Sequence, residues 1–224
     1  MIKIFIGSIA LASILFSADL QNEGVEITYT DANDMEKTML VIRNKPSECK
    51  SVKFDPKVVY GENGQASDSV SENCKKAFVT YMGKISPIKF SPKVETYGEV
   101  EVLQFIEDAK NNKNMLLIDS RTENWFYNGT IPSAVNIPYL YTKKSQYPDE
   151  FNETLETLGV KIVNEKYDFT NAKTILLFCN GAWCGQSPEA MKDLVAIGYP
   201  EEKLKWYRGG MQSWLSLGMS VIKP

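Results

Sequence analysis

Four cysteines carry the most reactive chemistry in this sequence, which contains no histidine. They are Cys49, Cys74, Cys179 and Cys184. The lack of histidine excludes Ser–His and Cys–His nucleophilic sites and every metal site with a histidine ligand. Acid–base chemistry near neutral pH must then come from cysteine, carboxylate, lysine, tyrosine or the substrate. The sequence predicts no cofactor and no metal.

The second pair of cysteines lies in one loop between a predicted strand and a predicted helix. Residues 175–178 form the most apolar strand of the sequence, and they lead directly into Cys179. Ser187 followed by Pro188 is typical of a helix start, with the serine as N-cap and the proline at the first helical position. The candidate catalytic residues of this loop are Cys179 and Cys184, and its candidate substrate-binding residues are Asn180, Gly181, Ala182, Trp183, Gly185, Gln186 and Ser187.

A strand–loop–helix unit of this kind can activate a thiol without a histidine. A cysteine at the carboxyl end of a parallel strand lies at the binding edge of the sheet. Loop amides and the N-terminus of the next helix stabilise a thiolate or a bound anion there. The same cradle can hold a persulfide, whose charge lies one atom further out. Arg208, a further substrate-binding candidate, either draws an anionic donor to this edge or packs over Trp206 or Tyr207.

The strand-end position makes Cys179 the predicted nucleophile. Cys184 lies closer to the predicted helix, so it is a resolving thiol, a sulfur relay or a disulfide partner in the same loop. Trp183 either forms one wall of the site or caps the core. The alternative that Cys179 only fills space in the core leaves the asparagine and glycines of its loop without a reason.

The elements that position this loop alternate between strands and helices from about residue 97 onward. Apolar residues recur at helical spacing over residues 99–111. Further strands are predicted at 115–118, 134–137, 175–178 and 204–207, with helices within 141–172, from 187 to Gly198, and around Trp214. This alternation predicts an α/β fold, with a parallel sheet flanked by helices on both faces.

Residues 19–96 form a predicted N-terminal accessory region with a weaker pattern. Short strands are expected at 25–29, 39–42 and 77–82, and a loop at 61–71. Cys49 and Cys74 stand in polar, loop-like surroundings, which suit a structural disulfide worth about 3 kcal/mol in the chain-entropy model. Four cysteines allow three connectivities, and two free thiols are the alternative.

The first 18 residues are typical of an export signal. One lysine precedes the apolar residues 4–16, and Ser17 and Ala18 are small residues suited to cleavage. The apolar stretch is shorter than the roughly 20 residues of a membrane-spanning helix, although an uncleaved anchor is the alternative. We therefore expect a periplasmic protein without a membrane partner after signal removal. Its formal net charge of −3 argues against a nucleic-acid partner.

Two segments resemble the rhodanese family: one spans residues 117–138, and the other is the strand, cysteine, loop and helix around Cys179, closed by residues 208–214. Residues 117–121 read Leu-Ile-Asp-Ser-Arg, and residues 129–138 read Gly-Thr-Ile-Pro-Ser-Ala-Val-Asn-Ile-Pro. Residues 208–214, Arg-Gly-Gly-Met-Gln-Ser-Trp, resemble the ending that follows the last strand of the family. The resemblance implies a rhodanese-like domain over 97–224. It also implies a sulfurtransferase that moves sulfane sulfur from an anion such as thiosulfate, through a persulfide on Cys179, to a small thiol or a sulfur-acceptor protein.

The sequence departs from the family at several positions. Thr130 and Ser133 replace the usual histidine and glycine, and the loop from Cys179 to Ser187 is longer and contains Cys184. The Asp119–Arg121 pair is expected to be mainly structural.

Two other functions stay open on the sequence. One is a thiol–disulfide oxidoreductase that uses both loop cysteines, and the other is a non-catalytic sulfur carrier or interaction module. A cysteine phosphatase of the same fold needs an arginine in the loop to clamp phosphate, and position 185 is glycine.

Overall fold

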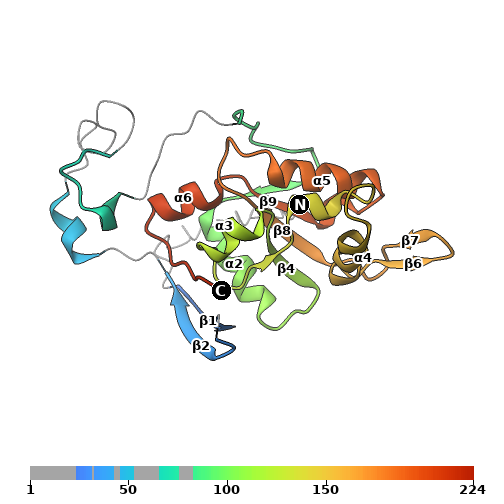
Figure 1. The fold of residues 1–224 in the computed structure, drawn as a ribbon, viewed down its shortest axis with the longest axis horizontal. Coiled ribbons are helices and arrows are strands. Elements are labelled where there is room, and N and C mark those ends of the chain that lie inside the picture. The colour runs from blue at the N-terminus through green and yellow to red at the C-terminus, as the bar shows by residue number, and fades with distance from the viewer. Residues whose placement is uncertain (1–23, 32, 43–45, 53–65, 76–82) are drawn as a thin grey trace, which may run out of the picture.

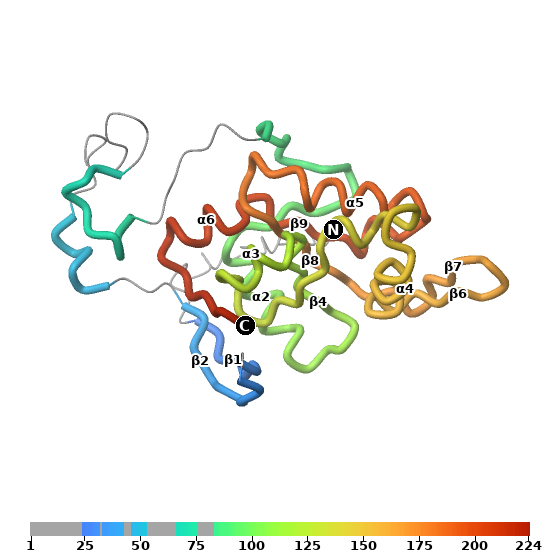
Figure 2. Tube along the Cα trace, in the orientation of Figure 1, coloured from blue at the N-terminus to red at the C-terminus, as the bar shows by residue number. Residues whose placement is uncertain are grey.

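The computed structural model describes residues 24–31, 33–42, 46–52, 66–75 and 83–224 (Figures 1 and 2). The expected export signal at 1–18 and the expected strand at 77–82 lie outside the described residues. In the part of the chain that is described, no helix has both the length and the apolar character needed to cross a membrane.

A five-stranded parallel sheet forms the centre of the fold. Its strand order is β3-β9-β8-β4-β5, and every neighbouring pair is parallel. The strands are β3 (Glu95–Tyr97), β4 (Met115–Asp119), β5 (Val135–Asn136), β8 (Thr174–Phe178) and β9 (Leu204–Tyr207). Residues Ile175 to Phe178 of the central strand β8 are all buried, because helices cover both faces of a parallel sheet.

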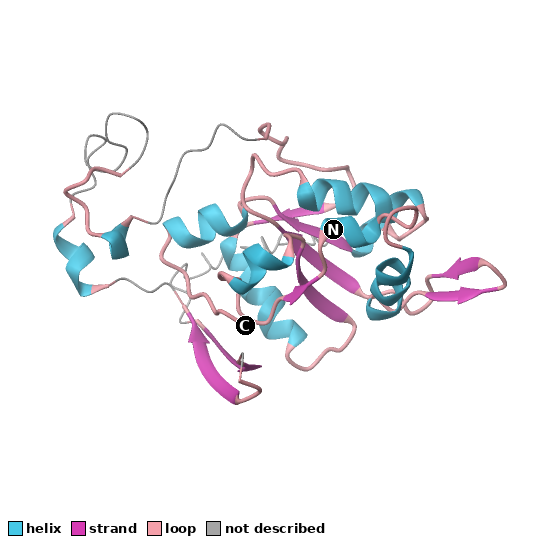
Figure 3. Cartoon of the chain, in the orientation of Figure 1, coloured by secondary structure: helices cyan, strands magenta, loops and turns pink. Residues whose placement is uncertain are grey.

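The helices divide between the two faces of the sheet (Figure 3). They are α2 (Glu99–Ala109), α3 (Glu123–Tyr127), α4 (Pro148–Thr157), α5 (Gln186–Ala196) and α6 (Gly210–Ser216), with the short 3-10 helices η3 (Tyr139–Thr142) and η4 (Glu201–Lys203). Leu155 of α4 and Met191 of α5 pack with Leu177 of β8 on one face. On the other face, helices α2 and α6 pack around Leu176, the adjacent residue of β8. The predicted α/β architecture is confirmed.

The region between β5 and β8 contains a hairpin that the sequence analysis did not predict. After α4, strands β6 (Lys161–Val163) and β7 (Lys166–Asp168) pair antiparallel and extend to one side of the molecule (Figure 1). Asn164 and Glu165 form the turn with φ of 48° and 63°. Two central residues with positive φ are typical of a tight hairpin turn, but the usual Asn-Gly or Asp-Gly signal is missing. Here the backbone pairing overrides the local preference of glutamate.

The accessory region contributes a two-stranded hairpin to the core. Strands β1 (Val25–Thr30) and β2 (Glu36–Val41) pair antiparallel, close to the strands expected from the sequence. Val25, Ile27 and Val41 are buried in the cluster around α2 and α6. This first part of the chain therefore packs against the sheet-and-helix core.

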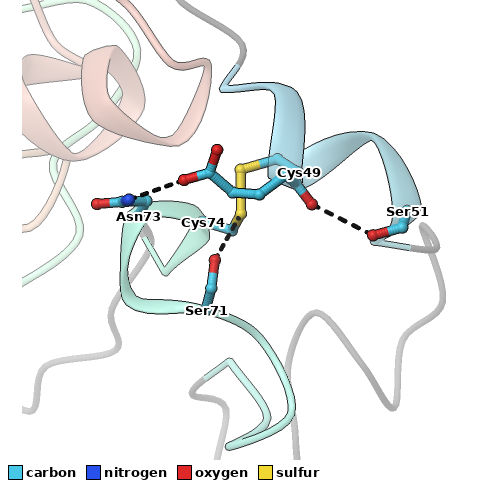
Figure 4. Close-up of a disulfide and its surroundings, with 6 residues drawn as sticks. Cys49, Ser51, Ser71, Asn73 and Cys74 are labelled. Atoms are coloured by element: carbon cyan, nitrogen blue, oxygen red, sulfur yellow. Dashed lines mark hydrogen bonds between the residues drawn. A yellow bond between two sulfur atoms is a disulfide. The ribbon is translucent and has the colours of Figure 1, made fainter.

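The predicted disulfide is confirmed. Cys49 lies in the 3-10 helix η1 (Ser47–Ser51), and Cys74 ends η2 (Glu72–Cys74). Their sulfur atoms are bonded at 2.05 Å, and the Cα atoms are 5.8 Å apart (Figure 4). The Asn73 side-chain amide donates a 2.8 Å hydrogen bond to the Glu48 carboxylate, which adds a second link between the two helices.

Candidate active site

The loop with the two free cysteines begins at the carboxyl end of the central strand. Strand β8 ends at Phe178, Cys179 follows it, and α5 begins at Gln186. Both Cys179 and Cys184 are free thiols, with 2% and 5% of their surface exposed. The topology therefore places Cys179 where the sequence analysis expected it, at the edge of the sheet where parallel strands end.

The start of helix α5 differs from the sequence prediction. Ser187 was expected to be the N-cap, but the helix begins at Gln186 with Gly185 as its cap residue. The buried Ser187 hydroxyl lies 3.2 Å from the Ser120 hydroxyl, at the end of β4. The backbone N–H and the hydroxyl of Ser187 also act to lower the pKa of the Cys179 thiol, against the effect of burial. The prediction was wrong because the serine side chain turns into the site.

The loop folds back on itself, which brings its two cysteines together. The Cys184 N–H donates a 2.9 Å hydrogen bond to the Gly181 carbonyl and closes a tight turn. The Cys179 sulfur lies 3.5 Å from the Cys184 carbonyl oxygen, and the interaction between the two thiols shifts the pKa of both. Two cysteines separated by four residues therefore share one buried site.

The segment that follows β9, which contains Gly209 and Gly210, lies directly against this loop. The Met211 N–H donates to the Cys179 carbonyl and the Gln212 N–H donates to the Asn180 carbonyl, both at 2.9 Å. Gly210 has φ of +54°, and a Cβ on it would lie 2.3 Å from the Cys179 carbonyl oxygen. Glycine is required here because the backbone lies directly against the loop.

Gln212 is a site residue that the sequence analysis did not single out. Its side-chain oxygen accepts a 2.8 Å hydrogen bond from the Trp183 indole N–H. A Cβ on Gly181 would lie 3.0 Å from both of these side chains. This hydrogen bond holds Trp183 against α6. No local sequence pattern indicated the contact, because the two residues are far apart in the chain.

Asp119 and Arg121 form a buried ion pair that reaches the loop. The Arg121 guanidinium lies 2.6 Å from the Asp119 carboxylate, and the Thr130 hydroxyl donates to the same carboxylate at 2.7 Å. A second guanidinium nitrogen lies 3.4 Å from the Asn180 side-chain oxygen. The structural role expected for this pair agrees with its burial and its partners.

The two thiols have opposite pKa shifts. Burial raises the pKa of Cys179 well above its ordinary value, and its hydrogen bond to Cys184 raises it further. The hydrogen bond from Cys179 is the largest cause that lowers the pKa of Cys184, to about 6. Backbone N–H groups of Gln186 and Asn180, and the positive charge of Arg121, also lower the pKa of Cys184. The two shifts therefore favour ionisation of Cys184 over ionisation of Cys179.

A segment from outside the loop lies across it. This strap, residues 83–88, donates hydrogen bonds from the Lys84 N–H to the Trp183 carbonyl at 3.1 Å and from the Ser86 N–H to the Ala182 carbonyl at 2.8 Å. Gly83 has φ of +75°, and a Cβ on it would lie 2.0 Å from the Trp183 carbonyl oxygen. The only sequence signals for the strap were a glycine and a proline, which are common in any loop.

Arg208 lies at this edge of the sheet, but its guanidinium binds the strap. It donates to the Ser86 carbonyl at 2.7 and 3.0 Å and to the Pro87 carbonyl at 3.1 Å. The guanidinium therefore holds backbone oxygens where an anionic donor was expected. In the described ranges, no three acidic or cysteine side chains are grouped so that they could hold a metal ion.

Comparison with known proteins identifies the family of this arrangement. The family model described as "Rhodanese-like domain" matches residues 102–217, which is more than half of the chain. This range includes both loop cysteines and the Gly-Gly pair, and it begins after the strap. No curated protein matches the chain.

Several solved structures are similar to parts of the chain. The BH2092 protein of Bacillus halodurans is 18% identical over 58% of this chain and 77% of its own, with a TM-score of 0.41. A human single-domain sulfurtransferase is 18% identical over 56% of this chain and 96% of its own, with a TM-score of 0.38. A thiosulfate sulfurtransferase of Pseudomonas aeruginosa is 14% identical over 58% of this chain and 20% of its own, with a TM-score of 0.37. With the family model matched over more than half of its length, the chain belongs to the rhodanese-like domain family.

Proposed function

We propose that this protein is a sulfurtransferase that takes sulfane sulfur from a small anion such as thiosulfate onto Cys179. The observation that carries the proposal is the position of Cys179 at the carboxyl end of β8, beside Ser187, whose N–H and hydroxyl favour its thiolate. Membership of the rhodanese-like family supports the same reaction class.

The first step needs no base from a histidine. The Cys179 thiolate attacks the outer sulfur of thiosulfate, the S–S bond of thiosulfate breaks, and sulfite leaves with the bonding electron pair. Cys179 becomes a persulfide anion. The donors already on the sulfur, together with the buried positive charge of Arg121 nearby, stabilise negative charge in this site.

Position and ionisation favour different cysteines as the attacking thiolate. The strand end favours Cys179, whereas the lowered pKa favours Cys184. Because the two thiols interact in one buried site, a proton that moves from Cys179 to Cys184 leaves the single negative charge on Cys179. We therefore keep Cys179 as the residue that bears the transferred sulfur.

We extend the proposal to the setting of the reaction. The sulfur acceptor is a small thiol or a sulfur-acceptor protein, and the protein works after export to the periplasm. The Cys49–Cys74 disulfide supports an oxidising compartment, where such bonds persist.

The test is to incubate reduced protein with thiosulfate and to measure sulfite release and the intact mass. We expect a gain of one sulfur atom, mapped to the Cys179 peptide, when Cys184 is replaced by serine. Absence of sulfite release from both the wild type and Cys184→Ser would contradict the proposed function.

One observation favours a second candidate, a thiol–disulfide oxidoreductase, because two buried thiols in contact can form and break a disulfide. Such an enzyme would reduce a model disulfide without any sulfur donor. The sulfurtransferase would need thiosulfate first.

A further inference from the structure

We propose that Cys184 is the internal acceptor of the sulfur reaction: it attacks the persulfide on Cys179, releases sulfide and leaves a Cys179–Cys184 disulfide. A dithiol reductant then reopens this bond. The inference rests on the proposed function, and it adds a second product and a second substrate class to it. The protein would act as a thiosulfate reductase that uses a dithiol.

Contact between the two thiols is the first observation. The turn closed by the Cys184 N–H and the Gly181 carbonyl places the Cys184 backbone against the Cys179 sulfur, at 3.5 Å from its carbonyl oxygen. Both side chains are buried, with 2% and 5% of their surface exposed, and they interact with each other, so the attacking and attacked sulfur atoms share one site. Proximity of this kind converts a bimolecular step into an intramolecular one.

Restricted access to Cys179 is the second observation. Only 2% of the Cys179 surface is exposed. The strap is hydrogen-bonded to Ala182 and Trp183, which belong to the same loop as Cys179. Arg208 holds the strap in place through the Ser86 carbonyl. A small anion needs far less opening than an acceptor protein does, whereas Cys184 already lies inside the site.

Amide contacts on Cys184 are the third observation. The backbone N–H groups of Asn180 and Gln186 lower the pKa of its thiol, and its sulfur lies 3.5 Å from the Gln186 side-chain oxygen. Such donors stabilise the thiolate that the attack requires. A cysteine that only filled space in the core would not need them.

The step balances in atoms and charge. The persulfide anion on Cys179 and the thiol of Cys184 give the protein disulfide and one HS⁻ ion. The bond between the Cys179 sulfur and the outer sulfur breaks, and its electron pair leaves with the outer sulfur. Two electrons from a dithiol, itself oxidised to a disulfide, then restore both thiols. Per cycle, one thiosulfate yields one sulfite and one sulfide.

A single-turnover experiment tests the inference. The protein carries Cys49→Ser and Cys74→Ser, so that no other thiol is present, and it is reduced and freed of reductant before thiosulfate is added. We expect equal amounts of sulfite and sulfide, and a Cys179–Cys184 peptide that has lost two hydrogens. In the same background, Cys184→Ser should release sulfite, retain one sulfur atom on Cys179, and release sulfide at least ~100-fold more slowly.

The other outcomes distinguish a failure of this inference from a failure of the proposed sulfurtransferase function. Sulfite release with the sulfur retained on wild-type Cys179 would overturn the internal acceptor but leave the sulfurtransferase standing. Sulfur found on Cys184 without sulfide release would replace the inference with a relay. No sulfite from any variant would overturn both. Since the products of the protein that keeps both loop cysteines decide the question, a poorly folded Cys184→Ser variant would not leave it open.

Discussion

The two cysteine pairs of this protein lie in opposite environments. Cys49 and Cys74 join two short 3-10 helices that have no buried residue, and they form a disulfide. Cys179 and Cys184 are both buried at the carboxyl edge of the sheet, and both are free thiols. The family model matches the second pair and not the first.

The surroundings of each cysteine, more than its residue type, decide whether it forms a disulfide or remains a free thiol. The first pair closes a chain separation of 25 residues and restricts the unfolded chain. The second pair is surrounded by backbone N–H groups, a hydroxyl and a buried arginine, which control where its proton lies. One pair is suited to stability, and the other to reaction.

Replacing the reactive cysteine should have the largest effect. Cys179→Ser should lower thiosulfate-dependent sulfite release by roughly a thousandfold or more, because the nucleophile is lost. Sulfite release in a single turnover measures this. A Cys179→Ser variant that still loads sulfur, now on Cys184, would reverse the assignment within the pair.

Breaking the buried Asp119–Arg121 ion pair next to the loop should have the next largest effect. Asp119→Ala leaves the Arg121 charge buried without its partner, so we expect a loss of about 3–5 kcal/mol in the free energy of unfolding. Urea denaturation measures it. The matched control is Glu107→Gln, which removes an exposed ion pair to Lys110 and should cost about 0–1 kcal/mol. Equal losses in the two variants would contradict the role of burial.

Removing the structural pair should change stability but not chemistry. The Cys49→Ser, Cys74→Ser variant should lose about 3 kcal/mol in the chain-entropy model. Its rate of sulfite release should stay that of the wild type. Thermal unfolding and sulfite assays check the two halves of this prediction. Peptide mapping of the wild type that finds Cys49 or Cys74 linked to the loop would break the separation of the pairs.

The pH dependence should show which thiol ionises. The pKa of Cys184 is lowered to about 6, so the thiolate should be present above that pH and disappear as the pH falls through it. Ultraviolet absorbance of the thiolate follows this titration. In Cys179→Ala the midpoint should move upward, because the largest cause of the lowered pKa is the Cys179 hydrogen bond. An unchanged midpoint would mean that the amides alone stabilise the thiolate.

Loosening the strap should have the smallest effect. Arg208→Lys keeps the charge but not the pair of guanidinium hydrogen bonds to the Ser86 carbonyl. We therefore expect the free energy of unfolding to fall by about 1 kcal/mol. Alkylation of the loop cysteines should become faster as the strap opens. If sulfite release instead falls because the KM for thiosulfate rises, with alkylation unchanged, Arg208 binds the donor as first expected.

The alternation of strands and helices and the site loop could be read from the sequence because the signals there are local and repeated. Apolar runs marked β4 and β8, and helical spacing marked α2. Cysteine directly after the most apolar strand gave the position of the site. The hairpin of β6 and β7 escaped detection because Asn164 and Glu165 are an unusual pair for its turn.

The contacts that shape the site depend on residues far apart in the chain, and local patterns do not record them. Ser187 was read as a helix cap from its neighbours, but the Cys179 sulfur and the Ser120 hydroxyl draw its side chain into the site. Arg208 has two interpretations from the sequence, an anion ligand or packing over Trp206 or Tyr207, yet its guanidinium donates to a carbonyl group more than a hundred residues earlier.

The sequence alone was enough to indicate the fold class, the family resemblance and the loop with Cys179 and Cys184, and it favoured a Cys49–Cys74 pairing among three possible connectivities. The burial and the hydrogen bonds of that loop depend on the tertiary structure. Folding buries the two sulfur atoms together, lays the strap over them and directs backbone N–H groups at Cys184. Hydrogen bonds and burial set the pKa of a thiol, and both depend on which distant residues surround it.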